Sequence, residues 1–457
     1  MSTTDRIQPK KLKGFRDFLP QQATLRRQIT EQIWNLATLA GFQAIDTPVL
    51  EYAETLLGTG GQETDKEVYR FQDHGEREVA LRFDLTVPFA RFVAENQADL
   101  VFPFKKVQIG NAWRGEKPQK GRYREFCQAD LDIIGVDTLA ADVEVLSCIL
   151  QNLERLVPGP FTMAIGHRVI LSALIQECLP GIAPGAEGRA LIALDKLAKI
   201  GVAAVTQLLI DIPGADPNGA EKLLHCLQLR RPNGDSDLEV LLQMLPGAEA
   251  KAEIKRLQAS VDLLRRLVQA NADASPNKGG SKAQVRVDLS IARGLGYYTG
   301  IVFETTIDGL DGFGSVSSGG RYNGLVSRFS SLELPGIGGS IGVDRLLAAL
   351  EQLGAQDKVN VARKGVFLAV TSENEWPYAF ELLQTLRQRG LLADVALKAG
   401  KLGNQFKFAD KRNYATVVTI GEEEVKSRSL SLKDLATGAE RRGISYEEGL
   451  VALSVAP

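Results

Sequence analysis

Apolar side chains recur every three or four residues between positions 22 and 41, where the run stops at Gly41. This spacing predicts a helix, because residues three and four apart share one helical face. Residues 85–96 repeat the pattern and predict a second helix. We expect Thr86 to cap this helix, with Pro88 tolerated in its first turn.

Shorter apolar runs, rich in β-branched and aromatic residues, predict strands between the helices. The segments at 42–51 and 77–84 are of this kind, and a longer strand pair fills 107–135 around a short cationic loop. The strands and helices do not alternate as regular βαβ units. We therefore expect an antiparallel α+β domain and not a doubly wound sheet.

The pattern changes twice further along the chain. Helical spacing dominates residues 170–275, which we interpret as a helical domain inserted into an α+β domain formed by 1–169 and 276–352. After a loose linker at 353–363, residues 364–457 alternate strand and helix and predict a small α/β domain. A length of 457 residues suits two or three domains of about 150 residues each.

Composition narrows the class of protein without identifying it. The chain is 44% hydrophobic and 24% charged with a net charge of −2, which argues against a protein coated in positive charge for indiscriminate nucleic-acid binding. No apolar run is long enough to span a bilayer, and the first residues lack the apolar centre of a secretory signal, so we expect a cytoplasmic protein with no membrane partner. The cysteines and histidines lack metal-ligand spacing, so we expect no metal held by the protein, and we interpret His167 as structural.

The most informative segment is the strand predicted around residues 125–134. Alternate side chains of an extended strand point to opposite faces, and one face of this strand is apolar and suits a core. The other face carries an aromatic ring, an amide and two carboxylates, from Phe126, Gln128, Asp130 and Asp132. Such a surface suits a ligand with a flat base, phosphates and a cationic group.

Arginines at the ends of apolar segments indicate how phosphates could be held. These are Arg114, Arg122, Arg293 and Arg345, each beside glycine or turn residues. Any one of them could be an ordinary surface arginine, but together with Phe126 they favour a nucleotide site, because guanidinium groups bind phosphate oxygens in pairs. The P-loop pattern is absent from the sequence. The glycines of 336–342 resemble the dinucleotide-binding pattern, but Ile341 stands where that pattern needs its third glycine. We expect those glycines to allow close packing or close approach of a ligand.

Acidic and phenolic side chains indicate a second part of the site. Asp84 and Asp132 suit recognition of an ammonium and an imidazole, because a ligand would supply the partners that buried charges need. Solvated strand ends are the alternative, but Asp84 closes an apolar strand just before a helix start, where functional residues often lie. Thr86 and Gln128 are close to these carboxylates in the sequence and could add neutral hydrogen-bond donors to the same site. Tyr298 and Tyr322 are candidate phenol donors, although hairpin filling would also explain the glycine-rich segment around Tyr298.

Long collinear motifs resemble the histidyl-tRNA synthetases, which are class II aminoacyl-tRNA synthetases. GFRDFLP at 14–20, LRFDLTVPFARF at 81–92 and the arginine-rich strand pair are similar to the family's N-terminal and motif 2 regions. ARGLGYYTGIVFE resembles its histidine signature, and GGRYNGLV and GIGGSIGVDRL resemble the segments leading into motif 3. KLGNQFKFADKRNYATVVTIGEEE resembles its anticodon-binding domain, and the Asp-Leu-Thr and QADLD variants resemble the eukaryote-like branch.

The resemblance implies a fold and a reaction. The α+β domain would be a class II catalytic domain with an antiparallel sheet and the helical insertion, and residues 364–457 would bind the anticodon. The enzyme would activate L-histidine with ATP and Mg²⁺ to histidyl-adenylate and pyrophosphate, and then transfer histidine to the 3′ end of tRNA-His. It would be a homodimer, with residues 42–51 as the interface strand.

The resemblance also implies residue roles. Arg114 and Arg293 would be catalytic, holding the α-phosphate and the histidine carboxylate. The ATP site would comprise Arg114, Glu116, Arg122, Phe126 and Arg345. The histidine site would comprise Asp84, Thr86, Arg114, Gln128, Asp132, Arg293, Tyr297, Tyr298 and Tyr322. The tRNA acceptor end would face Lys117, Gln119 and Lys120.

One departure and three alternatives accompany this interpretation. Gly296 stands where the family usually has aspartate in RGLDYY, which we interpret as a variant and not as loss of function. The main alternative is a non-catalytic histidine sensor resembling the regulatory subunit of ATP-phosphoribosyltransferase, but such paralogues generally lack the C-terminal domain and parts of the histidine signature. A class II synthetase for another amino acid and a simple RNA-binding protein are the other two.

Overall fold

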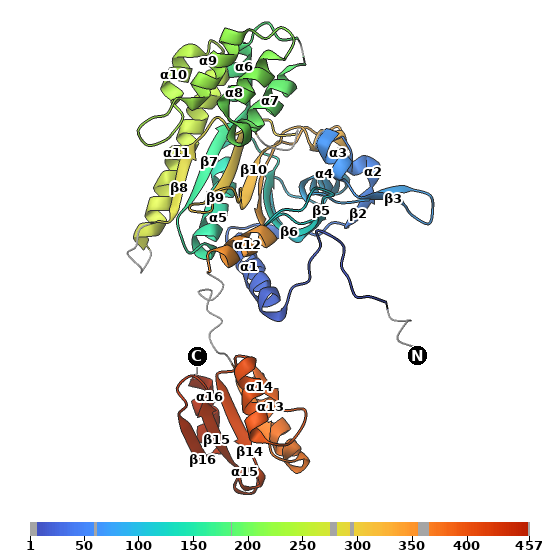
Figure 1. Ribbon diagram of the computed structural model, residues 1–457, viewed down its shortest axis with the longest axis vertical. Helices are drawn as coiled ribbons and strands as arrows, with labels where there is room; N and C mark the ends of the chain where they lie inside the picture. Colours follow the sequence, from blue (N-terminus) through green and yellow to red (C-terminus); the bar gives the residue numbers. More distant parts are fainter. Residues whose placement is uncertain are drawn as a thin grey trace. The chain divides into compact units, whose positions relative to one another are not determined.

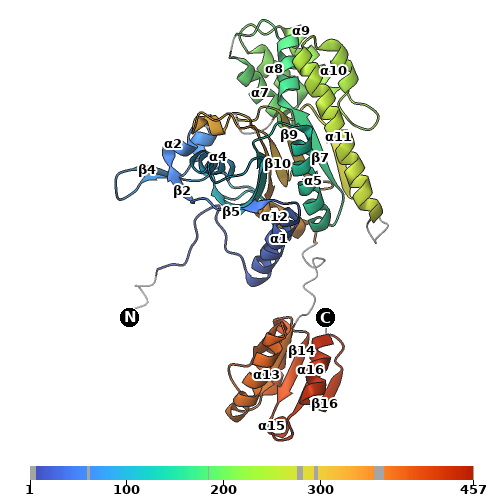
Figure 2. The same ribbon diagram turned by 180° about the vertical axis from the view of Figure 1, so that it is seen from behind.

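The computed structural model describes residues 7–58, 62–183, 185–274, 281–292, 297–354 and 365–455, and all structural statements below concern these residues. The chain forms two compact units, Met1–Ala355 and Gln356–Pro457. Figures 1 and 2 show their elements from two opposite sides.

The first unit is built on an eight-stranded sheet with the strand order β1-β5-β6-β11-β10-β9-β7-β8. Its strands are β1 (Gln43–Ala44), β5 (Phe104–Trp113), β6 (Glu125–Ile134), β7 (Phe161–His167), β8 (Ala283–Val287), β9 (Ile301–Ile307), β10 (Ser317–Arg321) and β11 (Gly336–Gly342). Neighbours run antiparallel, except that β1 is parallel to β5 and β7 to β8. The antiparallel α+β fold expected from the sequence is confirmed.

The two faces of this sheet have different neighbours. Helices α1 (Pro20–Leu39), α5 (Leu139–Leu156) and α12 (Val343–Gln352) pack on one face, where the apolar side chains of β6 are buried. Helix α4 (Thr86–Glu95) lies over the other face, and its Phe89 shares a core cluster with Phe104 and Tyr322. The polar side of β6 therefore lies on the α4 side of the sheet.

The start of α4 corrects one expectation. Thr86 is the first residue of the helix and not its cap, because the preceding Leu85 occupies the N-cap position and offers no side-chain hydrogen bond. Instead, the backbone N–H of Val87 donates to Asp84 Oδ1 at 3.1 Å. Pro88 lies in the first turn, as expected.

The strand expected at 42–51 is also corrected. Its two ends belong to different sheets, because β1 pairs with β5 while β2 (Leu50–Tyr52) joins a three-stranded sheet in the order β2-β4-β3. Pro48 has no backbone N–H for a strand ladder, and the carbonyl of Thr47 accepts from the Arg82 guanidinium at 2.7 Å. The remaining elements of this region are β3 (Arg70–Gln72), β4 (Glu78–Leu81), α2 (Ala53–Leu56) and α3 (Gln62–Glu67).

A group of helices lies between β7 and β8 in the chain and gathers beside that end of the sheet (Figure 1). They are α6 (Arg168–Cys178), α7 (Glu187–Asp195), α8 (Leu197–Ile210), α9 (Pro217–Gln228), α10 (Leu238–Met244) and α11 (Ala248–Ala274). The long helix α11 runs along α5 and β8, which brings it back to the sheet (Figure 2). No helix among the described residues is both long and apolar enough to cross a membrane.

The second unit has its own five-stranded sheet, in the order β13-β12-β14-β15-β16. Its elements are β12 (Val366–Val370), α13 (Trp376–Gln388), β13 (Ala393–Val395), α14 (Leu402–Lys411), β14 (Thr416–Ile420), α15 (Glu422–Ser427), β15 (Ser429–Asp434), β16 (Glu440–Ser445) and α16 (Tyr446–Val455). The first three strands of the order are parallel, and β15 and β16 add an antiparallel hairpin. A small α/β unit is thus confirmed.

Candidate active site

A pocket of about 190 Å³ lies where β6, β11, the start of β10 and the loop between β5 and β6 meet. Its lining includes six residues that the sequence analysis expects to bind ATP or histidine: Arg114, Glu116, Arg122, Phe126, Gln128 and Arg345. Four serines also line it: Ser315, Ser317, Ser318 and Ser340. We call this cavity the arginine pocket, after Arg114, Arg122 and Arg345. Side chains from distant parts of the sequence are therefore brought together as expected.

Arg114 forms one wall of the arginine pocket. Its Nε donates to the carbonyl of Phe83 at 3.0 Å, which fixes the guanidinium at the end of β5. The same guanidinium carbon lies 5.1 Å from the centre of the Phe126 ring. A fixed cation beside an aromatic plate can hold a phosphate next to a flat base.

The other arginines give the arginine pocket its charge. Arg122 Nη1 donates to Glu116 Oε2 at 3.2 Å, so that pair is neutral as a whole. Arg345, in the first turn of α12, donates to the carbonyl of Phe313 at 3.2 Å. With Arg114, the lining carries three arginines against one carboxylate. The arginine pocket is therefore suited to an anion.

A second set of polar side chains lies on the α4 side of the sheet, and we call it the carboxylate cluster: Asp84, Lys106, Asp130, Asp132, Tyr297, Tyr298 and Tyr322. Asp132 is 1% exposed and accepts from two side chains. Tyr322 donates to its Oδ1 at 2.6 Å, and Lys106 Nζ lies 2.8 Å from its Oδ2. A buried ion pair with an added hydrogen bond fixes the position of this carboxylate.

Asp84 is the second anchored carboxylate of the cluster. Tyr297 donates to its Oδ2 at 3.3 Å, and burial raises the pKa of Asp84 to about 6. The ring of Tyr297 packs edge-on against Tyr298 and Tyr322, with centroids 5.0 Å and 6.0 Å apart. Burial also raises the pKa of all three phenols, so they remain hydrogen-bond donors at neutral pH.

Several buried oxygens in this region have no hydrogen-bond partner among the residues that the structure describes. They include Gln108 Oε1 and Ser317 Oγ, and also Gln128 Oε1 and Asp130 Oδ1, which both belong to β6. The amide of Gln128 is oriented by its Nε2, which donates to Ser340 Oγ at 2.7 Å. Burial raises the pKa of Asp130. Because buried polar atoms are normally paired, the two oxygens on β6 indicate a ligand that brings hydrogen-bond donors.

Glycines let the strands close on the carboxylate cluster. A Cβ on Gly338 of β11 would lie 1.8 Å from Asp132 Oδ1, and one on Gly336 would lie 2.4 Å from the Tyr322 ring. A Cβ on Gly320 would lie 2.9 Å from the Tyr298 ring. The interpretation that these glycines allow close packing is confirmed, since a larger residue would displace the polar groups.

The other residues named in the sequence analysis belong to neither of these two sets. Arg293 and Gly296 fall outside the described residues. Thr86 is half-buried at the start of α4, next to Asp84. The side chains of Lys117, Gln119 and Lys120 are exposed on the loop between β5 and β6.

Lys106 is a polar residue that sequence reasoning missed, and Asp130 was named on its strand without a role. Lys106 is fully buried and lies opposite Asp132 in the β5–β6 ladder. The available signal was a lysine on the same alternation as the buried Phe104. Its partner depends on the register of two strands, which the sequence does not specify.

Comparison with known proteins gives a consistent set of matches. The family described as "Histidyl-tRNA synthetase" matches residues 14–346, and "Anticodon binding domain" matches 365–454. A histidine–tRNA ligase of Helicobacter pylori is 41% identical over 444 residues, which are 97% of this chain and 98% of that protein. One from Rhodopirellula baltica is 40% identical over 441 residues and covers 96% of each chain.

Solved structures show the same fold. The crystal structure of histidyl-tRNA synthetase from a Nostoc species superposes with a TM-score of 0.81 at 30% identity, covering 98% of this chain and 100% of that one. A Bacillus halodurans protein described as an ATP phosphoribosyltransferase regulatory subunit/histidyl-tRNA synthetase has a TM-score of 0.73 at 24% identity, over 91% of this chain and 99% of that one. At that identity the second likeness concerns the fold alone.

Proposed function

The chain belongs to the histidyl-tRNA synthetase family, and we propose that its arginine pocket and carboxylate cluster are the ATP and histidine halves of one active site. It is an ATP-dependent histidine–tRNA ligase. Such an enzyme joins histidine to the α-phosphate of ATP, releases pyrophosphate, and passes the histidyl group to tRNA-His. One observation carries the assignment of the site: an arginine-lined pocket adjoins buried acceptors that have no donor among the residues that the structure describes.

In the ATP half, Phe126 stacks on the adenine ring and Glu116 reads its edge. Arg114 holds the α-phosphate, while Arg122 and Arg345 bind the outer phosphates. The positive charge of the pocket lining supports this assignment. ATP enters as its Mg²⁺ complex, since Mg²⁺ is usually held by substrate phosphates and waters with one or two carboxylates.

In the histidine half, Asp84, Thr86 and Gln128 take the ammonium group. The unpartnered Gln128 Oε1 and the raised pKa of Asp84 support this, because both favour the arrival of a cationic donor. Asp132 and Tyr298 read the imidazole, and Tyr297 and Tyr322 line the pocket. We add Lys106, which forms a buried ion pair with Asp132 and fixes the position of that side chain.

The first chemical step needs positioning and charge stabilisation more than a general base. Arg114 and Arg293 hold the histidine carboxylate in line with the α-phosphate and offset the charge that develops there. In the second step a ribose hydroxyl of the tRNA attacks the activated acyl group, with Lys117, Gln119 and Lys120 against the acceptor end. Their exposure on one loop supports this placement.

We also propose that residues 170–275 form an insertion domain within a catalytic domain of 1–169 and 276–352, and that the second unit binds the anticodon. A homodimer is proposed with residues 42–51 at its interface, since Val49 and Leu50 are each 40% exposed. Light scattering should then give twice the chain mass of 49.7 kDa. A monomer alone would contradict the dimer.

The test of the function is ATP–pyrophosphate exchange with each amino acid in turn. We expect exchange with histidine alone, and an Arg114→Gln variant should lose at least roughly 100-fold of it, as for loss of a transition-state donor. Arg442→Gln, an exposed arginine of the second unit, is the matched control. Exchange with another amino acid would overturn the substrate, and histidine binding without exchange would favour the sensor.

A further inference from the structure

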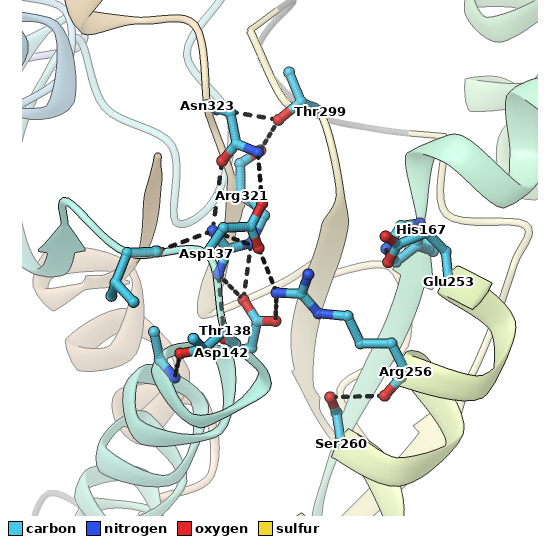
Figure 3. A network of polar contacts seen from close by, with 12 residues as sticks. Asp137, Thr138, Asp142, His167, Glu253, Arg256, Ser260, Thr299, Arg321 and Asn323 are labelled. Carbon is cyan, nitrogen blue, oxygen red and sulfur yellow. Dashed lines mark hydrogen bonds and ion pairs between the residues drawn. The ribbon is translucent and has the colours of Figure 1, made fainter. Parts of the chain in front are cut away.

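A polar network connects the helix α11 to the chain segments that carry Tyr298 and Tyr322 (Figure 3). We call it the Asp142 network, and its members are Asp137, Asp142, Arg256, Thr299, Arg321 and Asn323. Arg321 and Tyr322 are neighbours in extended chain, so their side chains point to opposite sides. Tyr322 reaches Asp132 in the carboxylate cluster, while Arg321 reaches Asp142 on α5.

Asp142 lies at the centre of this network. Its Oδ1 accepts from Arg321 Nε at 3.0 Å and Nη2 at 2.5 Å, and its Oδ2 accepts from Arg256 Nη2 at 2.8 Å. Asp142 is 2% exposed and Arg321 is 3% exposed. Charge-assisted contacts at this depth are strong, because water does not compete for them.

Asp137 connects the same arginines to two pocket segments. It forms ion pairs with Arg256 at 2.6 Å and with Arg321 at 3.3 Å, and it accepts a hydrogen bond from Asn323 Nδ2 at 3.1 Å. The backbone N–H of Asn323 donates to Thr299 Oγ1 at 3.1 Å, and that of Thr299 to the carbonyl of Arg321 at 2.7 Å. The segments 297–299 and 321–323 are therefore tied to each other and to α11.

The charges in the Asp142 network balance as two arginines against two aspartates. Removing Arg256 would leave one excess negative charge beside the buried Asp142–Arg321 pair. The Tyr298 ring packs directly on Gly320, so a small movement of the Arg321 segment changes the position of both tyrosines.

We propose that Arg256, on helix α11, is a positioning residue for histidine binding. It acts through Asp142 and Asp137 on Arg321 and Asn323, which hold Tyr298 and Tyr322 in place. This rests on the proposed assignment of these tyrosines to the histidine site. It makes the helical region after β7 a determinant of amino-acid affinity, although Arg256 itself does not line the arginine pocket.

The test is calorimetric binding of histidine to the full-length chain. Arg256→Ala should raise the Kd for histidine roughly tenfold, the loss expected for one charge-assisted hydrogen bond. The Kd for ATP should stay unchanged, and Arg256→Lys should recover part of the affinity. The matched control is Arg265→Ala, because Arg265 lies on the same helix and pairs with Asp235 at 2.7 Å, away from the pocket segments.

A double-mutant cycle with Tyr322→Phe separates positioning from general loosening of the fold. If Arg256 acts through Tyr322, the two losses will not add. Equal losses in the Arg256 and Arg265 variants, additive losses in the cycle, or no loss at all would overturn the proposal. A tenfold loss of binding in a chain without exchange activity would keep it and overturn the enzymatic function instead.

Discussion

Burial changes the pKa of one carboxylate that we assign to the histidine site. Among the described residues, Asp84 accepts hydrogen bonds from the Val87 N–H and from Tyr297. Burial raises the pKa of Asp84 to about 6, although the nearby charges of Arg114 and Lys106 oppose this shift. The charge of Asp84 should therefore change just below neutral pH.

Histidine binding should depend on the ionisation of Asp84. An ammonium pairs only with the carboxylate form, so the affinity should be constant above a pH of about 6 and fall as the pH drops through that value. Calorimetric titrations between about pH 5 and pH 8 measure this step. The imidazole of free histidine titrates nearby, so Asp84→Asn is the control. Identical pH profiles for the two proteins would contradict the assignment.

Gly338 should be intolerant of even one methyl group. Gly338→Ala would place a Cβ 1.8 Å from Asp132 Oδ1, which forces the carboxylate or the strand to move. We expect a stability loss of about 1–3 kcal/mol, as for overpacking, together with at least roughly tenfold weaker histidine binding. Urea unfolding and calorimetry measure the two effects. Gly324→Ala is the control, since its Cβ would have no neighbour within 4 Å; equal effects would refute the steric argument.

Single residues show how far the sequence predicts the site. Arg114, Arg122 and Arg345 could be predicted to lie together, because each ends an apolar segment beside a turn, and all three line one pocket. Lys106 could not be assigned, because its partner depends on the pairing of two strands. The partners of Gln128 and Asp130 depend on β11, which lies about 200 residues later in the sequence.

At the scale of elements, the sequence predicts helices better than short strands. The helix expected at 22–41 is found at Pro20–Leu39, because a long amphipathic repeat determines it. The strand expected at 42–51 is wrong as a single element, since Pro48 and the contacts of Thr47 with Arg82 interrupt it. Likewise, Thr86 does not cap α4: Leu85 is the N-cap residue, and the Asp84 carboxylate before it accepts from the Val87 N–H, a detail of backbone geometry that composition does not show.

The loop between β5 and β6 should contribute charge to tRNA binding. Lys117→Ala with Lys120→Ala should weaken tRNA-His binding and lower the slope of affinity against salt by about two, because two phosphate contacts are lost. Filter binding at several salt concentrations measures the slope. Lys117→Arg with Lys120→Arg keeps the charge and should keep the slope. An unchanged slope in the alanine variant would remove this loop from the interface.

At the scale of the whole molecule, each unit buries apolar side chains of its own. The core cluster of the second unit consists of residues from Val366 to Leu453. The sequence predicted its alternating strands and helices but not the hairpin of β15 and β16, whose exposed, charged second strand resembles a loop in composition. Two separate cores imply two separately folding parts.

The units should therefore be separable. A fragment of residues 1–355 should fold and retain histidine-dependent pyrophosphate exchange, since the candidate site lies within it. A fragment of 365–457 should unfold cooperatively in urea by itself. Aminoacylation of tRNA should be reduced in the first fragment. Aggregation or non-cooperative unfolding of either fragment would show that the two cores depend on each other.

The glycines of β11 also limit how the gene can vary. Any base change at the first or second position of a glycine codon yields either a stop or a residue with a Cβ. At Gly338 and Gly336 that atom would collide with Asp132 or Tyr322. Among the functional members of a random mutant library, these two codons should therefore carry only silent third-position changes. The codon of Gly324 should also carry changes that replace the amino acid. The close packing of the buried polar groups against β11 should thus be visible in the gene as two codons that tolerate almost no amino-acid change.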